Sequence, residues 1–431
     1  MQIDVFYSIY KKYPSIQTDS RKIQPNDLFF ALKGDNFNGN KFAQECLDKG
    51  AAYCILDEEP PFKSDKIILV ENVLLYLQQL ALFHRQQFNI PFIAITGSNG
   101  KTTTKELVAA VLSTTYNTYF TKGNLNNHIG IPLTILSIPL NATMAIIEMG
   151  ANHLLEIESY CKYTLPTFGI ITNCGKAHLE GFGSIEGVQK GKSELFKFLA
   201  LNHYPIFVNE AETYLSSLTY HNKNVILFNG KNSSINGTVK KNDPFLQIEV
   251  QIKETIFSIH TNLIGAYNLS NILAAVCIGN YFNVSFENIK KGIELYIPNN
   301  QRSQCIELKN YTIYLDAYNA NPSSMIKAIE NFSQLKGANK CLFLGAMKEL
   351  GEFSFIEHQQ LINLLDKYAW RFVALVGVEF ALCKHNYHYF NNVGDLKVFV
   401  AQNLPPVFST ILIKGSRSTQ MEKMVDVFKQ K

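Results

Sequence analysis

The sequence predicts an α/β protein with three domains: a small N-terminal α/β domain, a central P-loop-type domain with a mainly parallel sheet, and a Rossmann-like C-terminal α/β domain. The length of 431 residues suits two to three domains. Short β-branched strands alternate with amphipathic helical patterns, which is typical of parallel sheets. One strand leads through a glycine-bounded loop directly into a helix, and this unit marks the central domain.

The N-terminal domain is expected over residues 1–88, before that loop. Its most polar segment is Thr18-Asp19-Ser20-Arg21, which groups hydroxyl, carboxylate and guanidinium groups. The segment can be a solvated turn or a helix cap. It can also contact phosphate or uracil, because guanidinium and hydroxyl groups donate hydrogen bonds well to such ligands.

The central domain is expected over residues 89–297 and begins with a strand at 90–96. The loop that follows reads Gly97-Ser98-Asn99-Gly100-Lys101-Thr102-Thr103. Its glycines let backbone N–H groups approach an oxyanion, and the helix start adds its positive dipole end. Lys101 is expected to reach the outer phosphates of a nucleotide, and the hydroxyl of Thr102 to bind Mg²⁺. A glycine-rich turn can be purely structural, but the order of strand, loop and helix favours nucleotide binding.

This loop departs from the usual phosphate-loop pattern at one position. The pattern has a further glycine where this chain has Ile95, so the loop is the shorter Gly-x-x-Gly-Lys-Thr.

Polar residues follow two other strands of the central domain. A strand at 144–147 delivers Glu148, and His178 follows a strand at 167–172. Carboxyl ends of parallel strands line the ligand crevice of an open sheet, so both side chains are expected there. Glu148 suits Mg²⁺, because hard cations take carboxylate oxygen. A solvated glutamate and a packed histidine are the plain alternatives.

Amide and lysine side chains supply further candidates in the central domain. Residues 123–132 are rich in amides and glycine, and residues 265–275 begin a helix whose amides could read an adenine edge. Lys190 and Lys192 lie on another predicted helix and, without further context, suit a solvated surface. Residues 203–262 are strand-like and suggest no chemistry.

The C-terminal domain is expected over residues 298–431, after a linker at 297–302. Strands are predicted at 312–315, 340–344, 372–376 and 410–413, and helices at 323–335, 355–369, 394–403 and 418–429. One strand end, at 316–322, carries polar groups that suit ribose or base. Another places Lys414 and Arg417 beside a glycine and a hydroxyl, as an anionic substrate needs. His385 and His388 lack a nearby third ligand and are expected on the surface.

Composition excludes several classes of protein. A net charge of +4 is too small to indicate nucleic acid or an anionic membrane as a partner. The eight cysteines show no Cys-x-x-Cys spacing, so zinc and a disulfide framework find little support. The start of the chain lacks the features of a secretory signal, and no apolar run is long enough to span a bilayer. We therefore expect a cytoplasmic protein.

Taken in order, these motifs resemble the Mur ligases, the ATP-dependent ligases of peptidoglycan synthesis. The resemblance covers nearly the whole chain. Its motifs are Thr18–Arg21, Thr96–Thr102, Glu148–Asn152, Ala177–Phe182, Asp316–Pro322, Leu344–Gly351 and Lys414–Arg417. The segments Asn319–Pro322 and Glu349–Gly351 point to the type that joins D-alanyl-D-alanine to UDP-N-acetylmuramoyl-tripeptide. The family also uses the shorter phosphate loop.

The resemblance implies a role for each candidate residue. ATP phosphates would be held by Gly97, Ser98, Asn99, Gly100, Lys101, Thr102 and Thr103, and adenosine by Asn127, Asn271, Arg302, Asp316 and Asn319. Mg²⁺ would be held by Thr102 and Glu148, and a second Mg²⁺ by His178 and a carbamylated Lys192. Lys101, His178 and Lys192 would be the catalytic residues. Asp19, Ser20 and Arg21 would lie near the UDP group, and Lys414 and Arg417 near the peptide or dipeptide.

Two positions depart from the family pattern. Tyr267 stands where a histidine is common, and Ala346 where an aspartate is common. The rival hypotheses are a sister ligase that adds a single amino acid, a folylpolyglutamate synthetase-like enzyme, and a P-loop switch that hydrolyses nucleotide. We expect a monomer that uses ATP and Mg²⁺, with no nucleic-acid partner and no membrane span.

Overall fold

A computed structural model describes residues 1–299, 301–337 and 339–429 of the chain. These residues form two compact units, which are described separately below. The first unit comprises residues 1–95, 116–151 and 155–169, and the second comprises 96–115, 152–154 and 170–431. Asn300, within the expected linker, lies outside the described residues. The domain boundaries expected from the sequence stay predictions.

The first unit begins with a small parallel sheet. Its strands follow the order β1 (Ile16–Gln17), β2 (Leu28–Phe30), β5 (Tyr53–Leu56) and β6 (Ile67–Leu69). Helix α2 (Ala43–Asp48) covers it through a core that includes Phe29, Cys46 and Cys54. An antiparallel hairpin of β3 (Lys33–Gly34) and β4 (Phe37–Asn38) extends from β2. The expected small N-terminal α/β fold is therefore present.

The rest of the first unit consists of helices and a second parallel sheet. The helices are α1 (Ile3–Lys12), α3 (Val73–Arg85), α5 (Gly130–Leu136) and α6 (Glu156–Thr164). The parallel strands are β7 (Phe92–Thr96), β9 (Met144–Glu148) and β8 (Thr118–Phe120), with β9 between the other two. The apolar run of β7 is wholly buried, as strands of parallel sheets generally are.

The second unit carries the helix that follows the glycine-bounded loop. Its helices are α4 (Lys101–Leu112), α7 (Leu179–Phe182), α8 (Ile185–Leu201), α9 (Leu269–Tyr281) and α10 (Phe286–Leu295). Strand β10 (Phe168–Ile171) enters this unit, where β11 (Ile206–Asn209) and β12 (Val225–Phe228) pair in parallel. The segment at 203–262 also forms an antiparallel sheet of β13 (Ile235–Asn242), β14 (Leu246–Ile252) and β15 (Thr255–His260).

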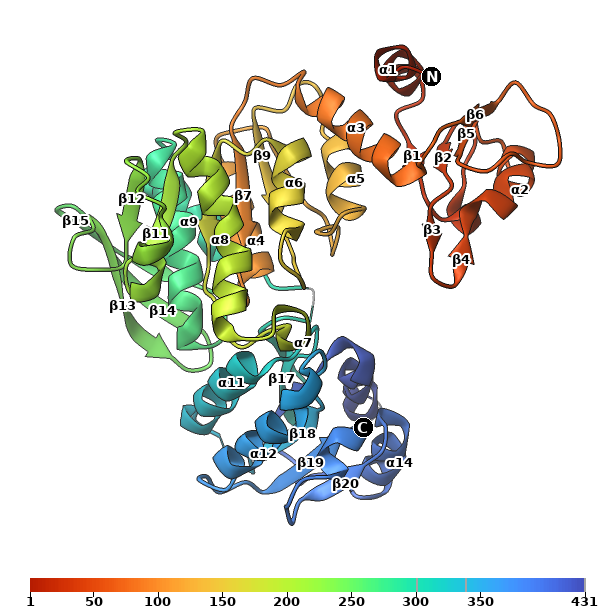
Figure 1. Cartoon of the computed structure of the whole chain (residues 1–431). Coiled ribbons are helices and arrows are strands. Elements are labelled where there is room, and N and C mark those ends of the chain that lie inside the picture. Colours follow the sequence, from red (N-terminus) through yellow and green to blue (C-terminus); the bar gives the residue numbers. More distant parts are fainter. Residues whose placement is uncertain (300, 338, 430–431) are drawn as a thin grey trace. The chain divides into compact units, whose positions relative to one another are not determined.

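A six-stranded sheet forms the C-terminal part of the second unit. Its order is β16 (Gln304–Glu307), β17 (Tyr311–Asp316), β21 (Ser409–Lys414), β18 (Cys341–Gly345), β19 (Phe372–Val376) and β20 (His388–Phe390). Only the β16–β17 pairing in this sheet is antiparallel. Its helices are α11 (Pro322–Gln334), α12 (Ser354–Leu365), α13 (Val378–Ala381), α14 (Val393–Gln402) and α15 (Val425–Lys429). Figure 1 shows α11 and α12 along one side of the sheet and α14 on the other.

One helix expected from the sequence is wrong in its length. Residues 418–429 were expected to form a single helix, but the structure has short 3-10 turns at Arg417–Thr419 and Met421–Met424 before α15. The break falls at Gln420, whose φ of +52° lies in the left-handed region. The α/β architecture itself is confirmed.

Candidate functional site

The glycine-bounded loop has the backbone shape that its sequence predicts. Gly97 has a φ of +141° and Gly100 a φ of +80°, conformations that favour glycine. A Cβ atom on Gly97 would lie 2.0 Å from Thr172 Oγ1, and one on Gly100 would lie 2.5 Å from Asn271 Oδ1. The Thr172 hydroxyl also donates to the backbone oxygen of Asn99 at 2.6 Å. Both glycines are therefore required by close neighbours as well as by backbone conformation.

The loop and the first turn of α4 concentrate hydrogen-bond donors. The ammonium group of Lys101 donates to the carbonyl oxygens of Gly97 at 2.7 Å and Ser98 at 3.2 Å. Thr102 and Thr103 follow in the first turn and are buried. Because helix α4 starts here, its free N–H groups and dipole favour an anion at this end.

Asn271 lies against this loop, as expected for a residue near the nucleotide. Its Oδ1 accepts from the Thr104 hydroxyl at 3.1 Å, and its Nδ2 donates to Asn268 Oδ1 at 2.8 Å. These contacts fix the amide on helix α9 beside α4. Its role toward adenosine stays a prediction.

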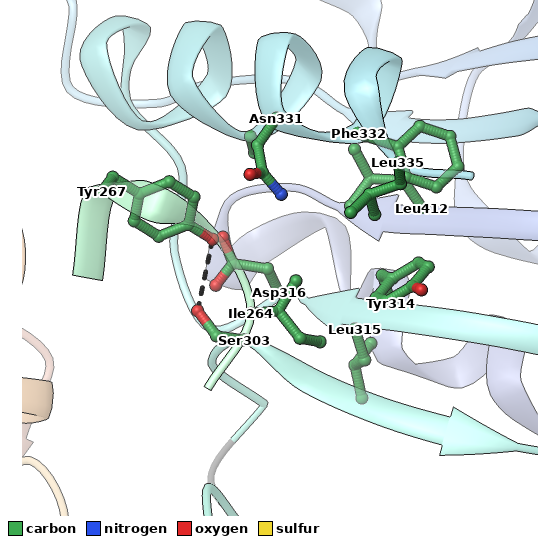
Figure 2. A pocket seen from close by; sticks show the side chains of 11 residues that line it. Ile264, Tyr267, Ser303, Tyr314, Leu315, Asp316, Asn331, Phe332, Leu335 and Leu412 are labelled. Carbon is green, nitrogen blue, oxygen red and sulfur yellow. Dashed lines mark hydrogen bonds between the residues drawn. The ribbon is translucent and has the colours of Figure 1, made fainter. Parts of the chain in front are cut away.

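Tyr267, the departure from the family pattern, faces a small buried pocket (Figure 2). Its hydroxyl lies 3.3 Å from Ser303 Oγ, and the pocket continues past Asp316 to Phe332 and Leu412. Burial, and to a smaller extent the charge of Asp316, raises the pKa of Tyr267. The phenol therefore stays neutral and packs between α9 and the start of the C-terminal part.

Asp316 and Lys414 form one ion pair in which the lysine is buried, although the sequence assigned them to different ligands. They are register partners at the ends of β17 and β21, and Lys414 Nζ lies 2.5 Å from Asp316 Oδ2. The same ammonium group lies 3.5 Å from the backbone oxygen of Asn319. The side chain of Lys414 is only 2% exposed, so the carboxylate compensates for its burial.

Two arginines share one aromatic ring beside this pair. The guanidinium carbon of Arg302 lies 3.9 Å from the centroid of the Tyr318 ring, and that of Arg417 lies 5.8 Å away. Arg417 also donates to Gln301 Oε1 at 3.1 Å. The ring holds two cations close together, and such an arrangement suits an anionic ligand.

His178 contacts a residue that the sequence did not single out as a site residue. Its φ is +53°, at the start of α7, and its Nδ1 lies 2.5 Å from Glu349 Oε2. The contact with His178, with a smaller contribution from the charge of Lys101, holds the pKa of Glu349 below its ordinary value. The pairing spans a long stretch of chain, so no local pattern predicts it.

Lys192 is fully buried on α8, which contradicts the reading as a surface lysine. Its Nζ lies 5.1 Å from the centroid of the Phe182 ring. Lys190, on the same helix, is exposed. Burial of a lysine is costly, so the position suits a special role better than a solvated one.

The C-terminal part of the second unit touches the phosphate loop directly. Asn321 Nδ2 donates to Asn99 Oδ1 at 2.8 Å, and the same asparagine caps helix α11 in a reciprocal capping box with Ser324. Lys176 pairs with the buried Glu357 at 2.6 Å. The Asn-Ala-Asn-Pro segment therefore both begins a helix and reaches the loop.

The other predicted site residues belong to the first unit. Glu148 ends β9, is 1% exposed, and accepts from Asn126 Nδ2 at 2.8 Å. The Asn127 side chain accepts from the backbone N–H groups of Ile129 and Gly130 and so stabilises the start of α5.

The segment Asp19-Ser20-Arg21 forms a capped 3-10 turn in the first unit. Asp19 accepts from the backbone N–H of Arg21, and its carboxylate pairs with the Arg21 guanidinium at 2.8 Å. This pairing lowers the pKa of Asp19 to about 2. Ser20 is buried, whereas Arg21 is exposed. The helix-cap reading is thus confirmed, and the contact with UDP stays a prediction.

The oxygen atoms of Thr102 and Glu148 are each suitable ligands for a Mg²⁺ ion that is also bound by a nucleotide. Among residues 1–299, 301–337 and 339–429, no group of three or more His, Cys, Asp or Glu side chains forms a ready-made metal centre. Mg²⁺ commonly binds through one or two carboxylates together with substrate phosphates, and so needs no such centre. Each unit carries a hard oxygen donor of the kind that Mg²⁺ prefers: the Glu148 carboxylate in the first unit and the Thr102 hydroxyl in the second.

Comparison with known proteins identifies the class. The chain matches the Mur ligase middle domain at residues 95–279, the Mur ligase glutamate ligase domain at 301–417 and the Mur ligase family catalytic domain at 12–85. A phosphate loop joined to a second α/β domain fits this class, and the chain belongs to the Mur ligase family.

Similar proteins span nearly the full chain. UDP-N-acetylmuramoyl-tripeptide–D-alanyl-D-alanine ligase from Buchnera aphidicola is 36% identical, over 96% of this chain and 91% of the relative. The Escherichia coli protein of that name is 33% identical, over 95% of this chain and 92% of the relative. The crystal structure of MurF ligase from Thermotoga maritima in complex with ADP has a TM-score of 0.85 at 26% identity, covering 96% and 97% of the two chains.

Within the described part of the chain, no helix combines the length and apolar character needed to cross a bilayer.

Proposed function

We propose that this chain joins D-alanyl-D-alanine to UDP-N-acetylmuramoyl-tripeptide in peptidoglycan synthesis, with conversion of ATP to ADP and phosphate. The observation that carries the proposal is the full-length similarity to relatives of that name, which includes the C-terminal part where an acceptor would bind. The contact between Asn321 and the phosphate-loop residue Asn99 supports it, because a ligase must bring a nucleotide and an acceptor together.

The reaction first activates a poor electrophile. The terminal carboxylate of the tripeptide attacks the γ-phosphorus of ATP, which gives an acyl phosphate and ADP. The free amine of the dipeptide then attacks the acyl carbon, and the tetrahedral intermediate expels phosphate as the amide forms. The protein mainly has to hold anions together and offset their charge.

The residues divide this work by position. The loop from Gly97 to Thr103 would bind the phosphates, and Lys101 would exchange its contacts with the loop carbonyls for phosphate oxygens. Thr102 and Glu148 would hold Mg²⁺, which when bound offsets charge on the transferring phosphoryl group. His178 and a carbamylated Lys192 would bind a second Mg²⁺.

The remaining residues would bind the organic parts of the substrates. Asn127, Asn271, Arg302, Asp316 and Asn319 would contact adenosine, Asp19, Ser20 and Arg21 the UDP group, and Lys414 and Arg417 the peptide or dipeptide. Because Asp316 and Lys414 form an ion pair, we expect adenosine and the peptide or dipeptide to bind close to each other.

We further propose that Lys192 loses one proton to become a neutral amine, which attacks CO₂ and loses a second proton as the N–C bond of the carbamate forms. A carboxylate then replaces the buried cation. Lys192→Ala should lose activity and regain part of it when short carboxylic acids are added, because they can occupy the vacated space. The matched control is the exposed Lys190→Ala, which should keep its activity without the acids. Absence of rescue in a folded Lys192→Ala protein would count against the carbamate.

The substrate assignment is tested by a panel of UDP-muramoyl peptides crossed with amino acids and dipeptides, with products read by mass spectrometry. Product from the tripeptide and D-alanyl-D-alanine is expected. A product only with single amino acids would replace the proposal with a sister ligase. The panel also reports whether the third peptide residue is diaminopimelate or lysine.

A monomeric state and a cytoplasmic location rest on the sequence alone and stay predictions. Light scattering after size-exclusion chromatography tests the first, and fractionation of cells tests the second.

A further inference from the structure

Glu349 comes from the C-terminal part of the chain, yet its carboxylate contacts His178 of the candidate nucleotide site. Its Oε2 is 2.5 Å from His178 Nδ1. That nitrogen is buried, and among the described residues it has no partner other than this carboxylate. The positive charge of Lys101 in the phosphate loop makes a smaller contribution to the lowered pKa of Glu349. The carboxylate therefore lies where His178 and the C-terminal part meet.

The backbone around Glu349 holds the carboxylate in this place. Glu349 has a φ of +61°, in the left-handed region that residues with a side chain rarely adopt. Its carbonyl oxygen accepts from the N–H of Glu180 at 3.2 Å. At Gly351, where φ is +52°, a Cβ atom would lie 3.4 Å from Glu180 Cβ. Residues 349–351 thus dock onto residues 178–180 through backbone as well as side chain.

A carboxylate on one imidazole nitrogen has a defined effect on the other. It fixes which nitrogen carries the proton and fixes the plane of the ring, and metal-binding histidines commonly have such a partner. With Nδ1 directed at Glu349, the ring leaves Nε2 available to a ligand.

We propose that Glu349 is a positioning residue that orients the imidazole of His178. The imidazole then has the orientation needed to bind a phosphate-bound metal ion only when residues 349–351 contact residues 178–180. The inference rests on the proposed function for the identity of the group that His178 serves, but the Glu349–His178 contact itself can be tested without it.

The first test uses the nucleotide-free protein and needs no activity. With ¹⁵N-labelled histidine, His178→Gln assigns the two imidazole nitrogen resonances of His178. Glu349→Gln should shift these resonances and leave those of the other nine histidines in place. The matched control is Glu352→Gln, an exposed acid of the same segment, which should leave them unchanged. Unchanged His178 resonances in Glu349→Gln would overturn the proposal, whatever the ligase substrates prove to be.

The second test separates positioning from a general structural role. Glu349→Gln should lower kcat by about 10- to 100-fold or raise the Mg²⁺ requirement to a similar degree. The KM for ATP should change by less than about threefold. The double variant of His178→Gln with Glu349→Gln should be no slower than His178→Gln alone, because the carboxylate acts through the ring. Losses that multiply in the double variant would show that Glu349 acts independently of His178, and would overturn the proposal.

Discussion

The Lys101 side chain is positioned in the phosphate loop by contacts within that loop. Its ammonium group is engaged by two carbonyl oxygens of its own loop, and the loop shape depends on glycines that neighbouring side chains leave no room to replace. A bound nucleotide would offer phosphate oxygens in exchange, which are stronger acceptors for an ammonium group.

Lys101→Ala should reduce kcat by at least about 100-fold, because it removes a cation that faces the transferred charge. The thermal unfolding midpoint should stay within a few degrees, since the carbonyl oxygens of Gly97 and Ser98 that accept from the ammonium group belong to the same loop as Lys101. Steady-state phosphate release and calorimetry measure the two quantities, with the exposed Lys197→Ala as the control. Near-normal kcat in Lys101→Ala would remove the phosphate-loop assignment.

For single residues, the sequence identifies those that belong to local motifs but does not predict contacts between residues far apart in the chain. The loop from Gly97 to Thr103 is recognisable because its chemistry is contiguous. The Asp316–Lys414 pair and the His178–Glu349 contact each join segments far apart in the chain, and no spacing rule predicts them. Local sequence alone suits Lys192 to a solvated surface, because nothing in its neighbours reveals the burial of that face of α8, and only the family resemblance assigns it to a metal site.

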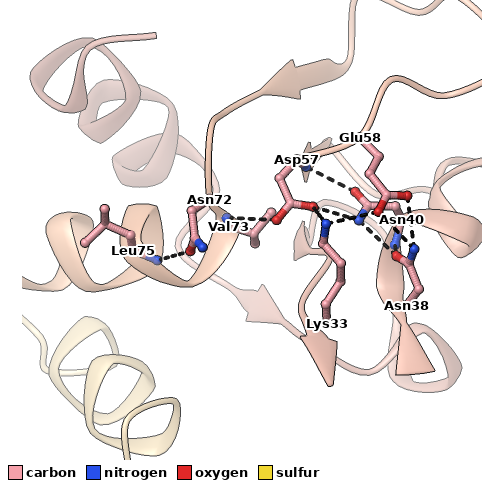
Figure 3. Close-up of polar contacts among 8 residues, drawn as sticks. All are labelled: Lys33, Asn38, Asn40, Asp57, Glu58, Asn72, Val73 and Leu75. Atoms are coloured by element: carbon pink, nitrogen blue, oxygen red, sulfur yellow. Dashed lines mark hydrogen bonds and ion pairs between the residues drawn. The ribbon is translucent and has the colours of Figure 1, made fainter. Parts of the chain in front are cut away.

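Among the elements, the hairpin of β3 and β4 shows how a short, polar structure is fixed (Figure 3). Asp57, after β5, receives a hydrogen bond from Asn40 at 2.8 Å and pairs with Lys33 at 3.0 Å. Its second oxygen lies 3.5 Å from the backbone N of Val73, at the start of α3. One carboxylate therefore links the hairpin, the end of β5 and the start of α3.

Asp57→Asn should weaken this junction by about 1–3 kcal/mol at neutral pH, because a charged acceptor is lost while its donors stay in place. Hydrogen exchange of β5 and α3 amides, compared with wild type, measures the effect. The neighbouring exposed Glu59→Gln is the control. Equal protection in Asp57→Asn and wild type would contradict this role.

The pH dependence of the same junction follows from the pKa of Asp57. Burial acts to raise this pKa, but hydrogen bonds from Asn40 and Lys33 outweigh burial and hold it below its ordinary value. A lowered pKa in the folded state means that the stabilisation is complete above the unfolded-state pKa of about 3.9, and is lost as the pH falls through the folded-state pKa. The difference between wild type and Asp57→Asn should therefore shrink as the pH falls below the unfolded-state pKa of about 3.9, measured with longer exchange times.

Elements with strong periodicity were predicted well, and those without it were not. The strands β17, β18, β19 and β21 were all expected close to their observed bounds, because each is a buried apolar run. The edge strands β16 and β20 are short and partly exposed, so their sequences carry little signal. The single helix expected at 418–429 is wrong, because the left-handed turn at Gln420 interrupts the backbone without interrupting the apolar pattern from which the helix was predicted.

For the whole molecule, the central claim is that the phosphate loop activates a carboxylate for attack by an amine. Within the second unit, Asn99 of the phosphate loop contacts Asn321, and Lys176, which follows β10, pairs with Glu357. The C-terminal part therefore contacts both the loop and the segment after β10. The sequence revealed both sets of motifs and their order, whereas their contact could be expected only from the family resemblance. A nucleotide switch would not require these contacts to be made together with a buried Lys192.

The most direct measurement is phosphate release from ATP with the two proposed substrates supplied separately and together. We expect release only when UDP-N-acetylmuramoyl-tripeptide and D-alanyl-D-alanine are both present, with one phosphate formed for each amide bond. Release at the same rate without either substrate would contradict the account, because it would show a nucleotide hydrolase in place of a ligase.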